Sequence, residues 1–272
     1  AGLEAACTAA EVGCNTFLLE KSNELGGLAS LISKIPAKNR LADFPHYLMH
    51  RAEQLDNLYI FKNTEGTPEN IRKFHPNIIV SSTGSAPLLP PIAGLKDRID
   101  NENHNIYSIL GMISHINDFP KDLEGKKVVV VGGGAVGLDV VEFFADRNAD
   151  ISIVEMMDQI GRDLDPVSKN DTKTMMKKHN VHQLTKTALL EVKDSSFLVK
   201  GDGEPYELPF EYGFVCLGMR AQGQLYQNLT EEFSSEDVEI MNIGDSQRAR
   251  RIIDGTQEGR NILTVLEQKG YL

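Results

Sequence analysis

Three closely spaced glycines form the pattern in this chain that most directly implies chemistry. Gly132, Gly134 and Gly137 have the spacing Gly-x-Gly-x-x-Gly, and they follow a β-branched run at residues 127–131. The run is typical of a buried parallel strand, and the apolar periodicity through residue 144 predicts a helix after the glycines. A glycine turn between strand and helix can hold a pyrophosphate, because the helix N-terminus presents free N–H groups and a partial positive charge.

Each glycine has its own physical role in such a turn. Gly132 permits the tight turn, Gly134 lets the backbone approach the phosphates, and Gly137 lets helix and strand pack closely. Ala135 and Val136 begin the helix and belong to the same predicted site. The sequence predicts that these residues bind a dinucleotide; a tight turn without a ligand is the plain alternative.

An acidic residue stands where the ribose of that nucleotide would lie. Glu155 is 18 positions beyond Gly137, at the end of the next predicted strand, residues 151–155. A carboxylate at this place accepts hydrogen bonds from the adenosine ribose hydroxyls. Met156 and Met157 follow it, so no Arg or Lys stands beside it to hold a 2′-phosphate. The pattern favours NAD(H) over NADP(H).

The same features recur 135 residues earlier in the chain. Gly2 aligns with Gly137, Glu20 aligns with Glu155, and residues 78–84 resemble residues 213–218. The first copy predicts a helix at about residues 3–12 and a strand at residues 16–20. Gly2 is then the third glycine of a second fingerprint, and Glu20 is its ribose acid.

By the same offset, the first strand and first two glycines of that copy would precede residue 1. We therefore expect either a truncated chain or one whose preceding residues were trimmed or disordered. An open α/β sheet without this strand lacks a central member unless another segment replaces it.

The order of motifs resembles that of the two-dinucleotide-binding-domain flavoproteins. The resemblance is carried by residues 1–6, Glu20-Lys21, residues 25–27, residues 82–87, the glycines of 132–137 and residues 243–245. Within these flavoproteins, the chain is similar to the C-terminal half of the family that contains 2,4-dienoyl-CoA reductase, 2-enoate reductase and trimethylamine dehydrogenase.

The resemblance implies that the first fingerprint binds FAD and that an inserted domain binds the nicotinamide cofactor. Glu20 would hold the adenosine ribose of FAD, Thr83 and Gly84 would line the crossing between domains, and Asp245 would hold the ribityl or pyrophosphate region. A turn or helix-capping aspartate is the alternative for Asp245. The remaining residues expected to contact a cofactor are Lys21, Gly26, Gly27, Gly218 and Gly244.

The implied fold class is α/β, with two Rossmann-like domains, the second inserted in the first. Residues 1–105 and 222–272 would form the FAD-binding domain, and residues 106–221 the NAD(H)-binding domain, with a first crossover at residues 87–91. In the resembled family, this half is joined to an N-terminal (β/α)8 barrel that carries FMN and an iron–sulfur cluster. These residues contain neither the barrel nor the cysteines of the cluster.

Composition excludes several classes of function. The formal net charge is -11 and the isoelectric point is near 5.1, which argues against a surface for nucleic acid or anionic membranes. No apolar stretch is long enough for a membrane span, and no leader precedes the first helix, so we expect a cytoplasmic protein. The three cysteines, Cys7, Cys14 and Cys216, predict no metal site, and residues 28–33 hold no cysteine pair, which excludes a dithiol relay there.

Hydride transfer between stacked nicotinamide and flavin rings needs no side-chain acid or base, so no catalytic residue is named. The leading hypothesis is an NADH-oxidising module that reduces FAD and passes electrons to a further centre, for reduction of an enoate or dienoyl thioester. That centre would belong to a barrel domain or an electron-acceptor partner, and the protein could form a homo-oligomer. One alternative is a module that holds ADP structurally without NADH chemistry; another is a stand-alone NADH oxidase or ferredoxin reductase.

The basic run at residues 248–251 could neutralise a cofactor phosphate, face a partner domain, or form a solvated helix face.

Overall fold

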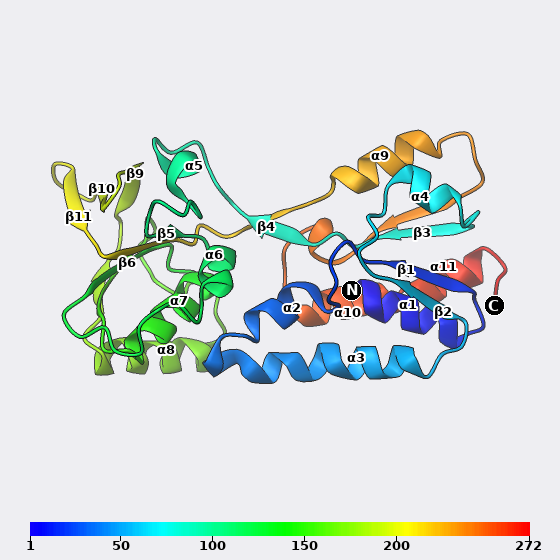
Figure 1. The fold of residues 1–272 in the computed structure, drawn as a ribbon, viewed down its shortest axis with the longest axis horizontal. Coiled ribbons are helices and arrows are strands. Elements are labelled where there is room, and N and C mark those ends of the chain that lie inside the picture. Colours follow the sequence, from blue (N-terminus) through cyan, green and yellow to red (C-terminus); the bar gives the residue numbers. More distant parts are fainter. The chain divides into compact units, whose positions relative to one another are not determined.

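The computed structural model describes residues 1–272 and divides them into two compact units (Figure 1). Unit 1 comprises residues 1–33, 38–86 and 219–272, and unit 2 comprises residues 34–37 and 87–218. The predicted boundary at 105/106 differs from this division. The segment from residue 87 belongs to unit 2 because Leu95 and Ile99 pack into its core with Val129 and Val215.

Unit 2 is built on a five-stranded sheet with the order β5-β12-β6-β7-β8. The strands are β5 (Ile106–Tyr107), β12 (Tyr212–Val215), β6 (Lys127–Val131), β7 (Asp150–Val154) and β8 (His182–Leu184), and all neighbours are parallel. The β-branched run predicted as a buried strand is β6, in the centre of the sheet. Helix α7 (Ala135–Ala145) follows it and contacts β6, β7 and β12.

The two faces of this sheet are covered differently. On one face lies the antiparallel sheet of β9 (Ala188–Val192), β10 (Ser196–Lys200) and β11 (Tyr206–Pro209), whose Phe197 and Val199 share a core with Val129 and Val131. On the other face, an aromatic cluster joins the sheet to the helices, with the rings of Phe144 and Phe214 4.8 Å apart. Helices α5 (Leu95–Arg98), α6 (Ile109–Ser114) and α8 (Pro166–Lys178) complete the unit.

Unit 1 contains two separate parallel strand pairs. Strand β1 (Thr16–Leu19) pairs with β2 (Leu58–Phe61), and β3 (Ile78–Ser81) pairs with β14 (Glu239–Asn242). No strand joins the two pairs. The mixed α/β fold class with parallel sheets is confirmed.

Helix α1 (Gly2–Glu11) contacts both strand pairs. Its Ala6 and Ala10 pack against Leu58, whereas its Ala9 packs in the cluster that contains Ile78. Small side chains on opposite faces allow one helix to approach both pairs closely. The other helices of the unit are α2 (Gly27–Ile32), the 3-10 helix η1 (Pro36–Ala42, partly in unit 2), α3 (Asp43–Glu53), α4 (Pro68–Arg72), α9 (Gln224–Glu232), α10 (Ile252–Arg260) and α11 (Ile262–Gln268).

Apart from the short segment at residues 34–37, the chain passes between the units at two neighbouring strands, β4 (Ser85–Pro87) and β13 (Met219–Ala221), which pair with each other. Pro87, the start of the predicted crossover, is the first residue of the long segment of unit 2. None of the helices combines the length and the apolar character that crossing a lipid bilayer requires.

Candidate nucleotide-binding sites

The glycine turn of unit 2 lies at the carboxyl end of β6. Gly132 has a φ of +109°, and its N–H donates to the carbonyl of Val154 at 2.8 Å. A Cβ at this residue would lie 2.1 Å from the carbonyl oxygen of Cys216. Both the positive φ and the close backbone therefore require glycine here.

The other two glycines of the fingerprint have opposite surroundings. A Cβ on Gly137 would lie 1.9 Å from the carbonyl oxygen of Gly132, so close packing of helix and turn requires this glycine. A Cβ on Gly134 would meet nothing within 4 Å. Gly134 is the N-cap of α7, and its missing side chain leaves the helix N-terminus open beside Ala135 and Val136. This open cradle fits the pyrophosphate of a dinucleotide.

The Glu155 carboxylate lies at the rim of the same turn. It accepts hydrogen bonds from the N–H of Gly133 at 2.6 Å and from the N–H of Met157 at 2.8 Å. The N–H of Gly161 donates to the carbonyl of Gly133 at 2.7 Å, so the loop after β7 closes onto the turn. The structure thus brings Glu155 to the predicted glycines.

Gly218 and Cys216 follow β12 at the same end of the sheet. Gly218 has a φ of +104°, and its carbonyl accepts the N–H of Leu88 at 2.9 Å. Complete burial raises the pKa of the Cys216 thiol to about 12. The thiol is therefore protonated at neutral pH, and it behaves as a small apolar group.

In unit 1, Gly2 begins α1, and a Cβ on it would lie 2.3 Å from Oγ of Ser82. Glu20 follows β1, and its carboxylate accepts the N–H of Ser22 at 2.8 Å. Lys21 is exposed beside it. The predicted ribose acid of this unit therefore stands at the carboxyl end of its strand, as Glu155 does in unit 2.

The remaining predicted residues of unit 1 form turns. Gly26 (φ +102°) and Gly27 (φ +55°) begin α2. Thr83 donates its hydroxyl to the carbonyl of Gln222 at 2.5 Å, and the carbonyl of Gly84 accepts the N–H of Gln222 at 2.9 Å. Thr83 and Gly84 thus both bind Gln222, the residue directly after β13.

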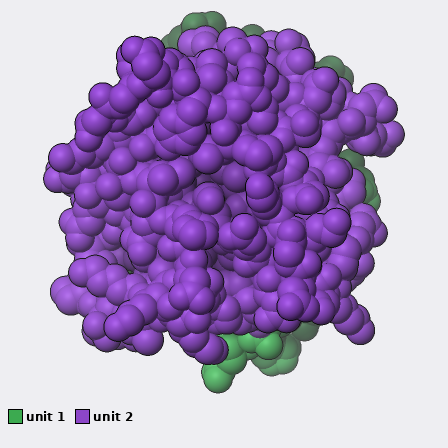
Figure 2. All heavy atoms as spheres, turned by 90° about the vertical axis from the view of Figure 1, so that its left-hand side faces the viewer, with its two compact units in different colours: residues 1–33, 38–86, 219–272 green, residues 34–37, 87–218 purple.

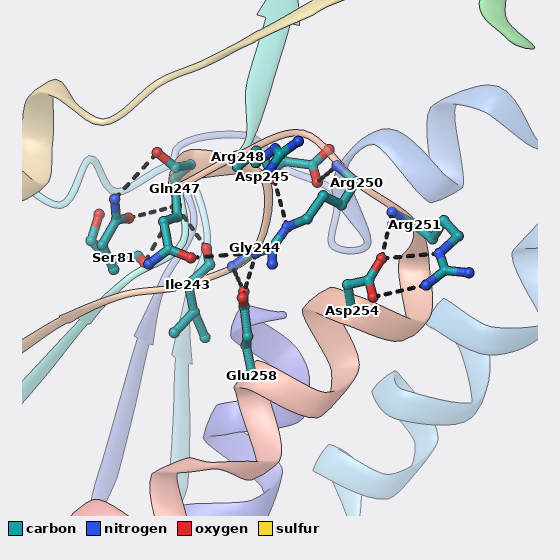
Figure 3. A network of polar contacts seen from close by, with 12 residues as sticks. Ser81, Ile243, Gly244, Asp245, Gln247, Arg248, Arg250, Arg251, Asp254 and Glu258 are labelled. Carbon is teal, nitrogen blue, oxygen red and sulfur yellow. Dashed lines mark hydrogen bonds and ion pairs between the residues drawn. The ribbon is translucent and has the colours of Figure 1, made fainter. Parts of the chain in front are cut away.

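Gly244 and Asp245 form a turn after β14 (Figure 3). The carboxylate of Asp245 accepts Oγ–H of Ser85 at 3.2 Å and the N–H of Arg250 at 3.1 Å. A Cβ on Gly244 would come within 2.7 Å of the Cβ of Ala1, so the turn lies against the start of α1. Each carboxylate oxygen keeps a further lone pair for a ligand hydroxyl.

A family profile described as "Pyridine nucleotide-disulphide oxidoreductase" matches residues 46–241, more than half of the chain. The chain belongs to the pyridine nucleotide-disulphide oxidoreductase family. This confirms the predicted resemblance to the two-dinucleotide-binding-domain flavoproteins.

Two curated relatives match almost the whole chain. It is 26% identical over 260 residues to an NADH oxidase of Thermoanaerobacter brockii, covering 95% of this chain and 38% of that protein. It is 27% identical over 297 residues to a metal reductase of Desulforamulus reducens, covering 96% and 42%. The chain thus spans about two fifths of the length of these relatives.

A solved 2-naphthoyl-CoA reductase in complex with 2-naphthoyl-CoA has the same fold, with a TM-score of 0.81 at 23% identity. The similarity covers 96% of this chain and 37% of that one.

The family name refers to a disulphide, but this chain carries no cysteine pair. Cys7, Cys14 and Cys216 are all free, and no group of three or more metal-binding side chains occurs. Residues 28–33, where the sequence has no cysteine pair, belong to α2 and its C-terminal turn.

Sequence reasoning missed two groups near the predicted sites. One is Gly133, where a Cβ would lie 3.0 Å from the Glu155 carboxylate; its only signal was the unbroken glycine run 132–134. The other is Glu258, whose contacts with Gly244 and Arg250 depend on the course of the chain. The interpretation of residues 248–251 as a solvated helix face is wrong, because these residues form a loop and α10 begins only at Ile252.

A polar depression in unit 2 lies away from the glycine turn. Its lining includes Asn105, Lys126 and Glu211, which precede β5, β6 and β12 and so mark the amino ends of these strands. Figure 2 shows the unit 2 surface, hollowed near the middle of the face in view. Ligands of open parallel sheets bind at the carboxyl ends, so the glycine turn, and not this depression, is the candidate nucleotide site.

Proposed function

We propose that this chain is an NADH:flavin oxidoreductase module, in which unit 2 binds NADH and unit 1 binds FAD. The observation that carries the proposal is the glycine turn of unit 2, with an open helix N-terminus at Gly134 and the Glu155 carboxylate held at its rim. When bound, the two cofactors supply hydride transfer from nicotinamide to flavin. The chain supplies binding, orientation and exclusion of water.

The Glu155 carboxylate, at the rim of the glycine turn, supports NADH rather than NADPH as the hydride donor. Glu155 would accept hydrogen bonds from the adenosine ribose and would repel a 2′-phosphate by like charge. Its two present partners are backbone N–H groups, which fix the carboxylate without neutralising it. Met156, 68% exposed, offers no positive charge beside it.

In unit 1, the residues proposed to hold FAD are Gly2, Glu20 and Asp245, with Thr83 and Gly84 at the crossing. Their support is their position, since each lies at the start of a helix or after the carboxyl end of a strand. Asp245 can still accept hydrogen bonds from a polyhydroxyl chain through its free lone pairs.

We further propose that the electrons leave FAD for a separate redox centre, in a barrel domain with FMN and an iron–sulfur cluster or in a partner protein. The proposal draws on the greater length of the relatives, of which this chain spans about two fifths. An enoate or 2,4-dienoyl thioester is the proposed final acceptor. A structural relative that binds an aromatic acyl-CoA thioester is consistent with this substrate class.

The test is an anaerobic absorption spectrum of the purified full-length protein, followed by titration with NADH and, separately, NADPH. Flavin bands that NADH bleaches at lower concentration than NADPH support the proposal. A colourless protein that releases ADP on denaturation would instead support a structural nucleotide site. Rapid turnover with dioxygen or ferredoxin, and none with enoates, would support a stand-alone oxidase or ferredoxin reductase.

A further inference from the structure

The carboxylate of Glu258, on α10, binds the Gly244–Asp245 turn (Figure 3). Oε2 of Glu258 accepts the N–H of Gly244 at 2.6 Å, and Oε1 accepts a hydrogen bond from the Arg250 guanidinium. The side chain of Glu258 is only 21% exposed and that of Arg250 is 30% exposed. This ion pair is therefore largely shielded from water, unlike the exposed pairs on most of the surface.

Arg250 closes the arrangement through its backbone. Its N–H donates to Oδ1 of Asp245, while its guanidinium also approaches Oε1 of Gln247 at 3.4 Å. Gly244, Asp245, Arg250 and Glu258 thus form a closed ring of contacts, in which each residue fixes the next. Gly244 is buried and has a φ of +68°, so its N–H has a fixed direction and needs an acceptor.

The neighbouring ion pair on the same segment does not have this role. Arg251 and Asp254 pair locally at the start of α10, and the Arg251 side chain is 82% exposed. Neither side chain has a hydrogen bond to the Gly244–Asp245 turn. Of these two ion pairs, only Arg250–Glu258 contacts the turn.

Charge gives Arg250 a second effect. Asp245 and Glu258 place two carboxylates on the turn proposed to face a flavin dinucleotide, whose pyrophosphate is also negative. The Arg250 guanidinium pairs with Glu258 and so offsets one of these two negative charges, which reduces the repulsion that such a ligand would meet.

We propose that Glu258 and Arg250 are positioning residues, which hold the Gly244–Asp245 turn in its flavin-binding conformation and set how long FAD stays bound. This inference rests on the proposed function, because it takes Asp245 as a ligand of FAD. It concerns two residues that the cofactor-binding pattern itself does not include.

The experiment measures FAD release from the full-length protein by the rise in free-flavin fluorescence, for wild type, Glu258→Ala, Glu258→Gln and Arg250→Ala. Glu258→Ala leaves the buried Gly244 N–H without its acceptor, and we expect FAD release about tenfold faster. Glu258→Gln keeps an amide oxygen for that N–H, and release should return to within about threefold of wild type. Arg250→Ala should lie between the two.

Glu236→Gln is the matched control, because Glu236 forms a guanidinium pair with Arg72 in the same unit with no contact to the turn. The shape of the bound-flavin absorption bands provides a second readout. If the wild-type protein holds FAD, equal release rates for Glu258→Ala and Glu236→Gln would overturn this inference and leave the proposed function standing. If Glu258→Ala does not fold, unchanged release in Arg250→Ala overturns it. A wild-type protein without FAD would overturn the proposed function as well.

Discussion

The carboxylate of Glu155 accepts a hydrogen bond from the N–H of Gly133, 22 residues earlier in the chain, at 2.6 Å. The contact joins the end of β7 to the glycine turn after β6. It places the acid that would select the nicotinamide dinucleotide directly on the turn that would hold its phosphates. Several expectations for binding and stability depend on this small region.

Replacing Gly133 should move the carboxylate of Glu155. A Cβ at Gly133 would lie 3.0 Å from Oε2 of Glu155 and 3.1 Å from Cγ1 of Ile160. We expect Gly133→Ala to weaken NADH binding about five- to tenfold, measured by calorimetry, because a shift of the carboxylate loses a hydrogen bond to a charged group. Gly203→Ala is the control, since a Cβ there meets nothing within 4 Å. Equal affinities in the two variants would contradict the assigned role of the contact.

Reversing the charge of the acid should change cofactor choice. Glu155→Arg removes the ribose acceptor and supplies a partner for a 2′-phosphate. The ratio of NADPH to NADH affinity should rise by about tenfold or more, which corresponds to one charge-assisted hydrogen bond. Titration of each nucleotide against flavin bleaching measures this ratio. An unchanged preference would show that Glu155 does not read the ribose.

Substitutions at two glycines of the same turn should have different effects, one on the stability of unit 2 and the other on NADH affinity. Gly137→Ala forces a Cβ to within 1.9 Å of the Gly132 carbonyl, so we expect unit 2 to lose about 1–3 kcal/mol of stability. Gly134→Ala adds a methyl group in open space, so its melting temperature should stay near that of wild type while NADH affinity falls. Thermal unfolding with and without NADH distinguishes the two. Loss of stability in Gly134→Ala would mean that the space is not a ligand cradle.

Glu4 should give unit 1 a pH-dependent stability. Its side chain is 2% exposed and pairs with Arg51 and Arg260, each at 2.8 Å. Burial by itself would raise the pKa of Glu4, but hydrogen bonds from Arg260 and Arg51 hold it below its ordinary value. Its stabilisation is therefore complete above the unfolded pKa, about 4.3, and disappears as pH falls through the lower folded pKa.

Glu4→Gln should consequently cost about 1–3 kcal/mol at pH 7, because the neutral amide weakens the charge-assisted hydrogen bonds to Arg51 and Arg260, although Arg51 keeps its pair with Glu11. The difference from wild type should shrink as the pH falls below about 4. Urea unfolding across this range measures both. Glu53→Gln, at an exposed carboxylate, is the control. A difference that stayed constant with pH would show that the charge of Glu4 is not responsible.

Thiol chemistry should be dispensable. Cys216 is buried with a raised pKa, and burial also raises the pKa of Cys7 and of Cys14. We expect Cys216→Ala to keep NADH-dependent flavin reduction within about threefold of wild type, because a protonated thiol acts only by packing. Loss of flavin bleaching in this variant with normal NADH affinity would point to a redox thiol.

The sequence predicted best the features that depend on neighbouring residues. The order of β6, glycine turn, α7, β7 and Glu155 follows from local periodicity and from the steric needs of a phosphate turn, and the structure has it with boundaries shifted by one residue at most. The repeat then predicted α1, β1 and the position of Glu20 in unit 1.

Features that depend on distant packing were not predictable in this way. The segment from residue 87 joined unit 2 because Leu95 packs beneath β9, far along the chain. The contact of Glu258 with Gly244 needs the loop at residues 248–251 to turn back, and a run of basic residues gives no signal for such a loop. The contact of Gly133 with Glu155 arises from the fold of the loop after β7.

The two units also differ in how they can form during synthesis. Apart from residues 34–37, unit 2 is one continuous segment, residues 87–218, whereas β3 of unit 1 must wait for β14, which ends at Asn242. Domains fold as units while the chain leaves the ribosome, and pairing over long sequence separations is slow. Unit 2 can therefore be complete while unit 1 still lacks β14 and its last three helices, so an interrupted translation product would contain the glycine turn of unit 2 but not the Asp245 turn.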